Sequence, residues 1–371
     1  MKKRKILIVT ERRADYSRFK PILSLLHIDQ RFEYDLCVTG LHLVKDHGHT
    51  INEIKDDGFQ IKYQFKMFLE DIDTTGAMVR GLSKALNEIT KVIENSKPDI
   101  ILSGFDIAAN LAITIAGAHM NIPVAHIQGG EVSGTIDESI RHAMSKFAHF
   151  HFASNKDACE RLIKMGENKE NVFNVGCPSI DALLSVKDDP YCLKKYNLKT
   201  PFFLVLQHPV TTEYDMAISQ MKETINAINK IDEDVLIILP NNDAGYLTMI
   251  NEINKTNYKV IESLGLNDYV NLLKRSEGLI GNSSSGIHET NTFNIPTINI
   301  GTRQNGRLRS QNIIDVPHNA EKILNAIKKS KKLKNKNYEK IYGTGNSSKK
   351  IIELLNTLNL NKPVLQKKIS Y

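Results

Sequence analysis

The sequence predicts an α/β protein made of two doubly wound, Rossmann-like domains that face each other across a cleft. Short apolar runs alternate with longer amphipathic stretches, and the alternation restarts near the middle of the chain. Such alternation is typical of a parallel sheet with helices on both faces. The 371 residues fit two domains of roughly 150 residues each.

Each predicted element of the first half is a β-branched or apolar run, or an amphipathic stretch between two such runs. Strands are predicted at residues 6–10, 34–39, 99–103, 123–127, 150–154 and 172–176. Helices are predicted at 17–26, 78–95, 107–120, 138–146 and 156–165. A polar, proline-containing link at 187–190 ends this half, so we place the first domain at residues 1–185.

The second half repeats the pattern. Strands are predicted at 202–207, 235–239, 259–262, 278–281 and 297–300, and helices at 213–229, 245–253, 266–275, 286–293 and 320–329. We place the second Rossmann-like domain at residues 186–345. A last helix at 348–358 lies within the remaining segment, 346–371, which we expect to pack back on the first domain.

Composition is that of an ordinary globular protein and excludes several classes. Hydrophobic residues make up 41% of the chain and charged residues 25%. No apolar run approaches the roughly 20 residues of a membrane span, and the four cysteines form no CxxC pair. The net charge of +7 comes without a recognisable nucleic-acid-binding module. We therefore expect a cytoplasmic protein with no metal, no membrane partner and no nucleic-acid partner.

A glycine- and serine-rich turn follows the predicted strand at 278–281. It contains Ser283, Ser284 and Gly286, with Glu289 one turn farther on. Backbone N–H groups and hydroxyls at a helix start favour a bound phosphate, and Glu289 is placed to accept hydrogen bonds from ribose hydroxyls. Serine capping of an ordinary helix is the alternative.

Two arginine-containing loops follow other predicted strands. Arg303 follows the strand at 297–300, and Arg13 and Ser17 follow the strand at 6–10. Arginine suits paired contacts with phosphate oxygens, so these residues are candidates for holding a diphosphate. Solvated surface loops are the alternative.

Acidic side chains cluster after the strand at 123–127. Glu131, Asp137 and Glu138 follow two glycines, and Arg141 lies one turn on. Grouped acids beside bases can acquire separate pKa values and divide acid and base roles. The helix dipole alone also favours acids in a first turn.

His208 ends the first strand of the second half. A strand-end histidine that faces a cleft can protonate a leaving group, and a structural histidine is the alternative.

Together these segments resemble the hydrolysing 2-epimerases of nucleotide-sugar metabolism, including the epimerase part of bifunctional epimerase/kinases and the UDP/GDP-N,N'-diacetylbacillosamine 2-epimerases. The likeness covers nearly the whole chain. It rests on residues 13–17, 134–137, 139–142, 207–212, 281–284, 301–304 and 365–368.

The resemblance implies a GT-B-like fold that holds the nucleotide mainly through its second domain. It implies loss of the proton at sugar C2 with departure of the nucleoside diphosphate, then addition of water to release a free manno-configured sugar. Glu138 and His208 are the implied acid–base groups, and no metal or redox cofactor is implied. The implied nucleotide-binding residues are Arg13, Ser17, Ser283, Ser284, Gly286, Glu289 and Arg303.

Two positions depart from the family pattern. The family usually has Gly-Asp-Arg where this chain has Gly104-Phe105-Asp106, and a glutamate where it has Gln128. Two expected acids are thus missing. Asp106 and Glu131 lie close by and are the candidate catalytic replacements.

The sequence therefore predicts a hydrolysing 2-epimerase of a nucleotide-diphosphate 2-acetamido sugar. The candidate substrates are UDP-N-acetylglucosamine and UDP- or GDP-N,N'-diacetylbacillosamine, with products that feed sialic or legionaminic acid synthesis. The alternatives are a GT-B glycosyltransferase and a non-catalytic nucleotide-sugar binding protein. Family members are often oligomeric, so we expect a homo-oligomer.

Overall fold

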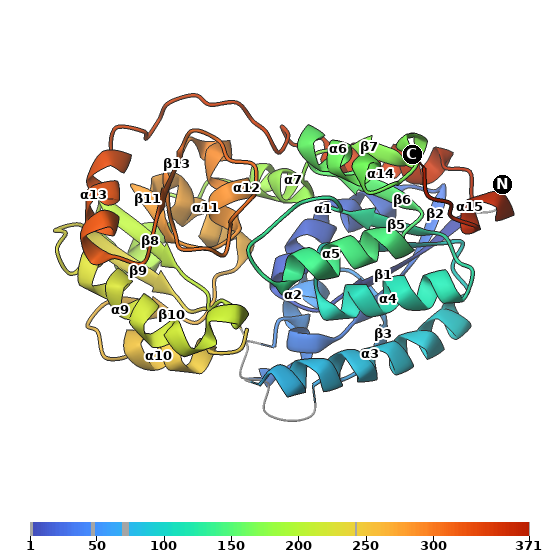
Figure 1. Cartoon of the computed structure of the whole chain (residues 1–371), viewed down its shortest axis with the longest axis horizontal. Coiled ribbons are helices and arrows are strands. Elements are labelled where there is room, and N and C mark those ends of the chain that lie inside the picture. Colours follow the sequence, from blue (N-terminus) through green and yellow to red (C-terminus); the bar gives the residue numbers. More distant parts are fainter. Residues whose placement is uncertain (1–2, 46–48, 69–73, 242, 371) are drawn as a thin grey trace.

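The computed structural model describes residues 3–45, 49–68, 74–241 and 243–370. Within them, the first half forms a seven-stranded sheet in the order β3-β2-β1-β4-β5-β6-β7, and the second a six-stranded sheet in the order β10-β9-β8-β11-β12-β13. Every strand pair is parallel. Figure 1 shows the two sheets in separate halves of an elongated molecule, each flanked by helices. The predicted α/β architecture with two Rossmann-like halves is confirmed.

The first sheet is built around β1. Its strands are β1 Arg4–Thr10, β2 Phe32–Val38, β3 Ile61–Gln64, β4 Ile100–Gly104, β5 Val124–Ile127, β6 Phe150–Ala153 and β7 Val172–Asn174. Strand order reverses at β1, which pairs with both β2 and β4. Ligands of such sheets bind beyond the carboxyl ends of the strands at this reversal.

Alternate residues of β1 enter different apolar cores. Ile6 and Ile8 join one buried cluster, and Leu7 and Val9 join another, as the period of two in a strand requires. α1 packs against α7 in the first layer, whereas α4 packs against α3 and α5 in the second. The helices are α1 Arg13–Ile28, α2 Ile51–Asp56, α3 Thr75–Ser96, α4 Ala108–His119, α5 Ile136–Phe147, α6 Lys156–Lys164 and α7 Pro178–Ser185.

The second sheet repeats this plan around β8. Its strands are β8 Phe202–Leu206, β9 Asp234–Ile238, β10 Lys259–Ile261, β11 Gly278–Gly281, β12 Thr297–Ile300 and β13 Ile313–Val316. Its helices are α8 Cys192–Lys195, α9 Ala217–Ile228, α10 Tyr246–Ile253, α11 Leu266–Arg275, α12 Ser285–His288 and α13 Ala320–Ser330. None of the helices in the described residues is long and apolar enough to cross a membrane.

The last segment lies on the first half. It contains α14 Ser347–Thr357 and α15 Lys362–Leu365, drawn in red in Figure 1. Ile351 and Leu355 of α14 are buried in the same cluster as Ile6 and Ile8. The Arg4 guanidinium donates hydrogen bonds to the carbonyls of Leu355 and Leu358.

Three predicted helices are wrong in extent. The helix expected over 17–26 begins at Arg13 and ends at Ile28. The helix expected over 286–293 ends at His288, and a 3-10 turn follows at Thr290–Phe293. The Thr290 hydroxyl donates to the Gly286 carbonyl at 2.9 Å, which competes with regular helical bonding there. The helix expected over 213–229 begins only at Ala217, after a 3-10 stretch in which Glu213 is non-helical.

Candidate functional site

The backbone of His208 is held by Asn282, a strand-end residue of the second sheet. Its backbone N–H donates to the Asn282 side chain at 2.7 Å, and the Asn282 amide donates back to the His208 carbonyl at 2.9 Å. Asn282 follows β11, which pairs with β8. The two strand ends therefore fix the backbone of His208 at the carboxyl edge of the sheet.

Among the described residues, one backbone donor orients the His208 ring. The Asn241 N–H donates to Nδ1 at 3.0 Å, so in the neutral ring the proton lies on Nε2. Burial and the positive charges of Arg303 and Arg12 hold the pKa of His208 well below its usual value. His208 is therefore neutral, with its Nε2–H available as a donor.

The two arginines nearest His208 keep unused donors. Arg303 forms an ion pair with Asp243 at 3.6 Å, and Arg12 binds Glu11 at 2.9 Å. The Nε of each guanidinium is buried without a hydrogen-bond partner among the described residues. Such donors are costly to leave unpaired, and they suit an anionic ligand.

Arg12 is positioned by a rigid loop at the end of β1. The Asp15 carboxylate accepts the backbone N–H groups of Glu11 and Arg12 at 2.9 and 2.8 Å. The Glu11 carboxylate accepts the N–H of Ala109 at the start of α4. Burial is the main cause that raises the pKa of Asp15 to about 6.

Arg13 and Ser17 have protein partners of their own. Arg13 pairs with Glu53 and donates to the Leu264 carbonyl in the second half at 2.9 Å. The Ser17 hydroxyl donates to Ala14 on its own helix. Arg13 thus bridges the two halves, while Arg12, which sequence reasoning passed over, is the arginine whose charge reaches His208.

Asp106 and Arg141 form an ion pair at the edge of the first sheet. The Arg141 side chain is only 1% exposed and also donates to the Glu131 carbonyl at 3.0 Å. Burial would raise the pKa of Asp106, but Arg141, Arg307 and Arg18 hold it below its usual value. Asp106 is therefore ionised.

Asp137 is a carboxyl group whose surroundings favour its protonated form. It lies in the first turn of α5, where Thr135 is the N-cap. Burial, followed by the negative charges of Asp106 and Asp243, raises its pKa. Because Asp106 belongs to the first half and Asp243 to the second, Asp137 lies where the halves meet. The sequence prediction named Glu131 and Glu138 of this acidic run as catalytic candidates and did not single out Asp137.

Glu138 supports the loop before α5. One of its carboxylate oxygens accepts the Ser133 N–H at 2.7 Å, and the other lies 3.9 Å from His142. The second oxygen is therefore the one left for chemistry.

Glu131 bridges the two halves with both carboxylate oxygens engaged. Ser154 donates to one oxygen, and Nε2 of His288 lies 2.9 Å from the other. Burial would raise the pKa of Glu131, but His288, Arg307 and Arg141 hold it below the usual range. Arg307 adds a second bridge by donating to the Val132 carbonyl at 3.0 Å.

The serine-rich bend, residues 283–286, lies close to Tyr269 and Glu289. The Ser283 hydroxyl accepts the Ser285 N–H at 3.3 Å, and the Ser285 hydroxyl is hydrogen-bonded to Tyr269. Ser283 is buried and Ser284 half-buried. After burial, the charge of Glu289 contributes to raising the Tyr269 pKa, so these side chains lie close together.

Gly286 has a packing role of its own. A Cβ there would meet Thr297 of β12 at 2.6 Å, so the bend lies against the neighbouring strand.

Phe105 and Gln128, the two positions at which this chain departs from the pattern it resembles, have a strained backbone and buried side chains. Phe105 and Gln128 have φ of 70° and 62°, a region that costs non-glycine residues of the order of 1 kcal/mol and is frequent at functional sites. The Phe105 ring lies 5.2 Å from Phe19 and under the Arg18 guanidinium. Gln128 donates to the Cys177 sulfur at 3.0 Å.

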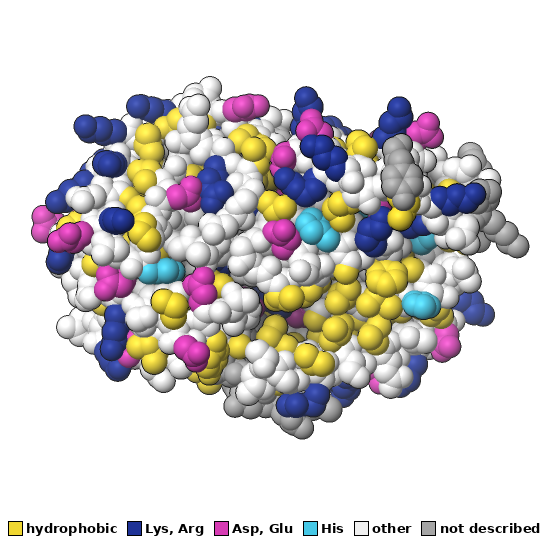
Figure 2. Space-filling model, in the orientation of Figure 1, with side chains coloured by type: hydrophobic (Ala, Val, Ile, Leu, Met, Phe, Trp, Pro, Cys, Tyr) yellow, Lys and Arg dark blue, Asp and Glu magenta, His cyan; other side chains and the backbone are white. Residues whose placement is uncertain are grey.

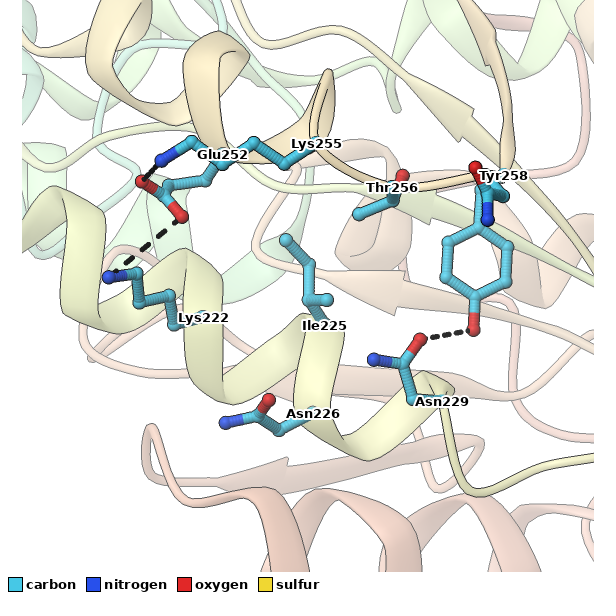
Figure 3. Close-up of a pocket in the computed structure, with 9 residues that line it drawn as sticks. Lys222, Ile225, Asn226, Asn229, Glu252, Lys255, Thr256 and Tyr258 are labelled. Atoms are coloured by element: carbon cyan, nitrogen blue, oxygen red, sulfur yellow. Dashed lines mark hydrogen bonds and ion pairs between the residues drawn. The ribbon is translucent and has the colours of Figure 1, made fainter.

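A separate hollow of about 630 Å³ lies on the second half between α9 and α10. Figure 3 shows Lys222 and Lys255 both directed to Glu252, and Tyr258 bonded to Asn229. None of the candidate site residues lines it. Among the described residues, no group of three His, Cys, Asp or Glu is arranged to hold a metal ion.

Known proteins are similar to this chain in sequence and in fold. The family model described as UDP-N-acetylglucosamine 2-epimerase matches residues 25–356. A hydrolysing UDP-N,N'-diacetylbacillosamine 2-epimerase of Legionella pneumophila is 35% identical, with 99% of this chain and all of that protein covered. A GDP/UDP-N,N'-diacetylbacillosamine 2-epimerase of Campylobacter jejuni is 32% identical over 85% of each.

Solved structures share the fold at lower identity. A Neisseria meningitidis UDP-GlcNAc 2-epimerase bound to UDP-GlcNAc matches with a TM-score of 0.77 and 19% identity, covering 95% of this chain and 99% of that one. A Staphylococcus aureus protein solved with UDP matches with a TM-score of 0.80 and 20% identity, covering 99% of this chain and all of that one. The chain belongs to the UDP-N-acetylglucosamine 2-epimerase family.

Proposed function

We propose that this chain is a hydrolysing 2-epimerase that converts a nucleotide-diphosphate 2-acetamido sugar into the free manno-configured sugar and a nucleoside diphosphate. The observation that carries the proposal is the grouping of His208, Arg12 and Arg303 with the protonatable Asp137 where the two halves meet. This grouping supports the proposal because the arginines can donate to a diphosphate while the carboxyl groups act on the sugar.

The nucleotide end of the substrate is assigned to the second half and its neighbours. Arg303 and Arg12 offer their unpaired buried Nε–H groups to the diphosphate. Ser283, Ser284 and Gly286 belong to the bend beside it, and Glu289 is assigned to the ribose. Arg13 and Ser17 serve this end only after exchanging their present partners.

The chemistry needs one base and one acid at the sugar. Asp137 or the free oxygen of Glu138 takes the proton from C2, and the C1–O bond to the diphosphate breaks to leave a glycal. Water then adds at C1 while the other of these two carboxyl groups delivers a proton to C2 from the opposite face, which inverts that centre. Asp106, held ionised by Arg141, keeps the pKa of Asp137 raised.

His208 is assigned to the leaving diphosphate. The positive charges of Arg303 and Arg12 contribute to its low pKa in the free protein. A bound diphosphate offsets those charges, so the pKa of His208 rises as the substrate binds. The ring can then stabilise or protonate the departing oxygen.

Glu131 is assigned to holding the halves together. Both of its oxygens are engaged and its pKa is low, which makes it a poor proton donor near neutral pH.

The relatives favour two substrates. The names of the Legionella and Campylobacter relatives point to N,N'-diacetylbacillosamine carried by UDP or GDP, and the family description points to UDP-N-acetylglucosamine. We propose the first class, because its named relative matches the whole chain. Its free product would enter sialic or legionaminic acid synthesis.

Incubation in heavy water with UDP- and GDP-linked forms of both sugars tests this function. Release of free sugar with deuterium at C2, read by mass spectrometry, is the expected result. Product formation only with an added acceptor would favour a glycosyltransferase. Unchanged substrate with retained binding would favour a non-catalytic binding protein.

We also propose a cytoplasmic homo-oligomer. Leu111 and Ile115 on α4 are half-buried, and Val79 on α3 and Phe147 on α5 are exposed by 66% and 37%. Figure 2 shows apolar side chains gathered on this face, over α4 and its neighbours. Light scattering that gives a mass near the 41.9 kDa of one chain at working concentration would contradict the oligomer.

A further inference from the structure

The carboxyl end of α5 is held by a residue from the far end of the chain. The Lys367 ammonium lies 3.0, 2.9 and 2.6 Å from the backbone carbonyls of Ser145, Lys146 and Ala148. The last carbonyls of a helix have no partner within the helix, and a cation there is favoured by the helix dipole. Lys367 thus caps α5 from outside.

The same ammonium belongs to a buried charge network. Glu167 is 2% exposed and lies 2.6 Å from Lys367, 2.7 Å from Lys146 and 2.8 Å from His151. Lys146 is itself in the last turn of α5. The helix end is therefore fixed between the Glu167 carboxylate on one side and the tail on the other.

The tail that carries Lys367 is itself anchored. The Ser370 N–H donates to the Gly166 carbonyl at 3.0 Å. Gly166 has φ of 86°, and a Cβ there would meet Ile369 at 2.9 Å. Lys367 consequently acts from a fixed position.

Hydrogen bonds lead from this helix end to the candidate site. The Ser145 hydroxyl, one residue before Lys146, donates to the Arg141 carbonyl at 3.0 Å. The Arg141 guanidinium in turn binds Asp106 and the Glu131 carbonyl. A shift of α5 along its axis would therefore move Arg141, and with it Asp137 in the first turn.

We propose that Lys367 is a positioning residue, which from the C-terminal tail fixes α5 so that Asp137, Glu138 and Arg141 are held in the active arrangement. The catalytic consequence rests on the proposed function, whereas the capping of α5 does not. Lys367 touches no reacting group and acts only through the helix.

Lys367→Met tests this, with Lys368→Met as the matched control. Both replace a lysine of the same segment, but Lys368 is exposed and makes no such contacts within the described part of the chain. We expect kcat of Lys367→Met to fall about 10-fold, because small displacements of reacting groups are costly. The acid limb of its kcat profile should also move as Asp137 shifts relative to Asp106, while UDP affinity stays within about twofold. Lys367→Arg should restore most of the turnover.

Three outcomes would overturn the catalytic part: normal turnover in Lys367→Met, an equal loss in Lys368→Met, or a loss with an unmoved pH profile and no rescue by arginine. If Lys367→Met folds poorly, Lys367→Gln takes its place under the same criteria.

Hydrogen exchange separates this proposal from the reaction itself. In the unliganded protein, amides of residues 140–148 should exchange faster in Lys367→Met than in Lys368→Met, while those of α9 stay unchanged. Equal exchange in α5 would show that Lys367 does not hold the helix, whatever the protein catalyses. Release of no sugar by the unaltered chain would instead overturn the proposed function and the catalytic consequence that rests on it, while the capping of α5 would stand.

Discussion

At the scale of single residues, His208 shows how surroundings select a protonation state. Asn241 fixes its tautomer, Asn282 fixes its backbone, and burial with two guanidinium groups keeps its ring neutral. Arg303 and Arg12 disfavour a second proton on the His208 ring. An anionic substrate would offset the positive charges of these same two arginines. The ring is therefore arranged to gain basicity when the ligand arrives.

Removing the imidazole should abolish most turnover. We expect His208→Ala to lower kcat by about 10²-fold, the scale of a positioned acid–base group. His119→Ala, which alters an exposed histidine at the end of α4, is the control and should keep normal rates. Steady-state assays of free-sugar release give the answer, and near-normal turnover in His208→Ala would rule out the role.

The pKa of His208 should depend on the ligand. In the free protein we expect its ring resonances to remain those of the neutral form down to well below pH 6.5. Saturating UDP should move the titration upward, because the diphosphate offsets the charges of Arg12 and Arg303. NMR titration of the ring with and without UDP measures this, and an unchanged or lower pKa would contradict the assigned diphosphate position.

At the scale of elements, sequence pattern predicts buried strands better than edge strands. β1 and β8 are continuous apolar runs because both faces are covered. Of the four edge strands in the described residues, β7 and β10 were predicted, whereas β3 and β13 were missed. At four residues each, IKYQ and IIDV are too short for periodicity alone to separate a strand from a loop.

The same limit applies to the site. The sequence placed the candidate residues on loops after strands, and the structure has these loops at the carboxyl ends of parallel strands, where ligands of such sheets bind. The sequence could not tell Arg12 from Arg13, or Asp137 from Glu138. Adjacent residues at a helix start point roughly 100° apart, so only the packed structure decides which one faces the gap.

The loop before α5 needs a glycine to meet the second half. The Gly134 N–H donates to the Arg303 carbonyl at 3.0 Å, and a Cβ there would overlap the Thr302 carbonyl. Gly134→Ala should therefore separate Arg303 from Asp137 and lower kcat/KM by about 10-fold.

The control for this variant is Gly76→Ala, where the added Cβ meets only the tip of Arg80 at 3.2 Å. Its kcat/KM should be unchanged. Equal values for the two variants would show that the contact at Gly134 does not matter for turnover.

At the scale of the whole molecule, buried polar contacts join the two halves. Glu131 meets His288, Arg307 meets Val132, and Gly134 meets Arg303. Isolated buried charges are costly, whereas paired and hydrogen-bonded ones are tolerated. The two halves are therefore complementary in charge where they touch, and this arrangement depends on the protonation of buried groups.

Stability should fall as pH drops below about 6.5, the usual histidine pKa. Burial lowers the pKa of His42 and His126 to about 3 and of His149 to about 4. As pH falls, these rings are protonated first in the unfolded chain. The stability that the neutral rings contribute is therefore fully present above pH 6.5 and is lost as pH falls toward the pKa values of the rings in the folded chain. His42 and His126 would each account for roughly 3 kcal/mol by pH 4.

Carboxyl groups modify this profile in both directions. The pKa of Glu167 is lowered to about 2, so the stability that its ionised form contributes is lost as pH falls below 4.5. The pKa of Asp15 is raised to about 6, so its protonation favours the folded chain between pH 6 and 4. This gain partly offsets the stability lost through the histidines. Thermal unfolding at pH 8, 6, 5 and 4 should therefore show Tm falling most steeply below pH 5. His119→Gln, at an exposed position, should leave the slope unchanged. A Tm that is flat from pH 8 to 4 would mean that these buried rings are not held neutral by the fold.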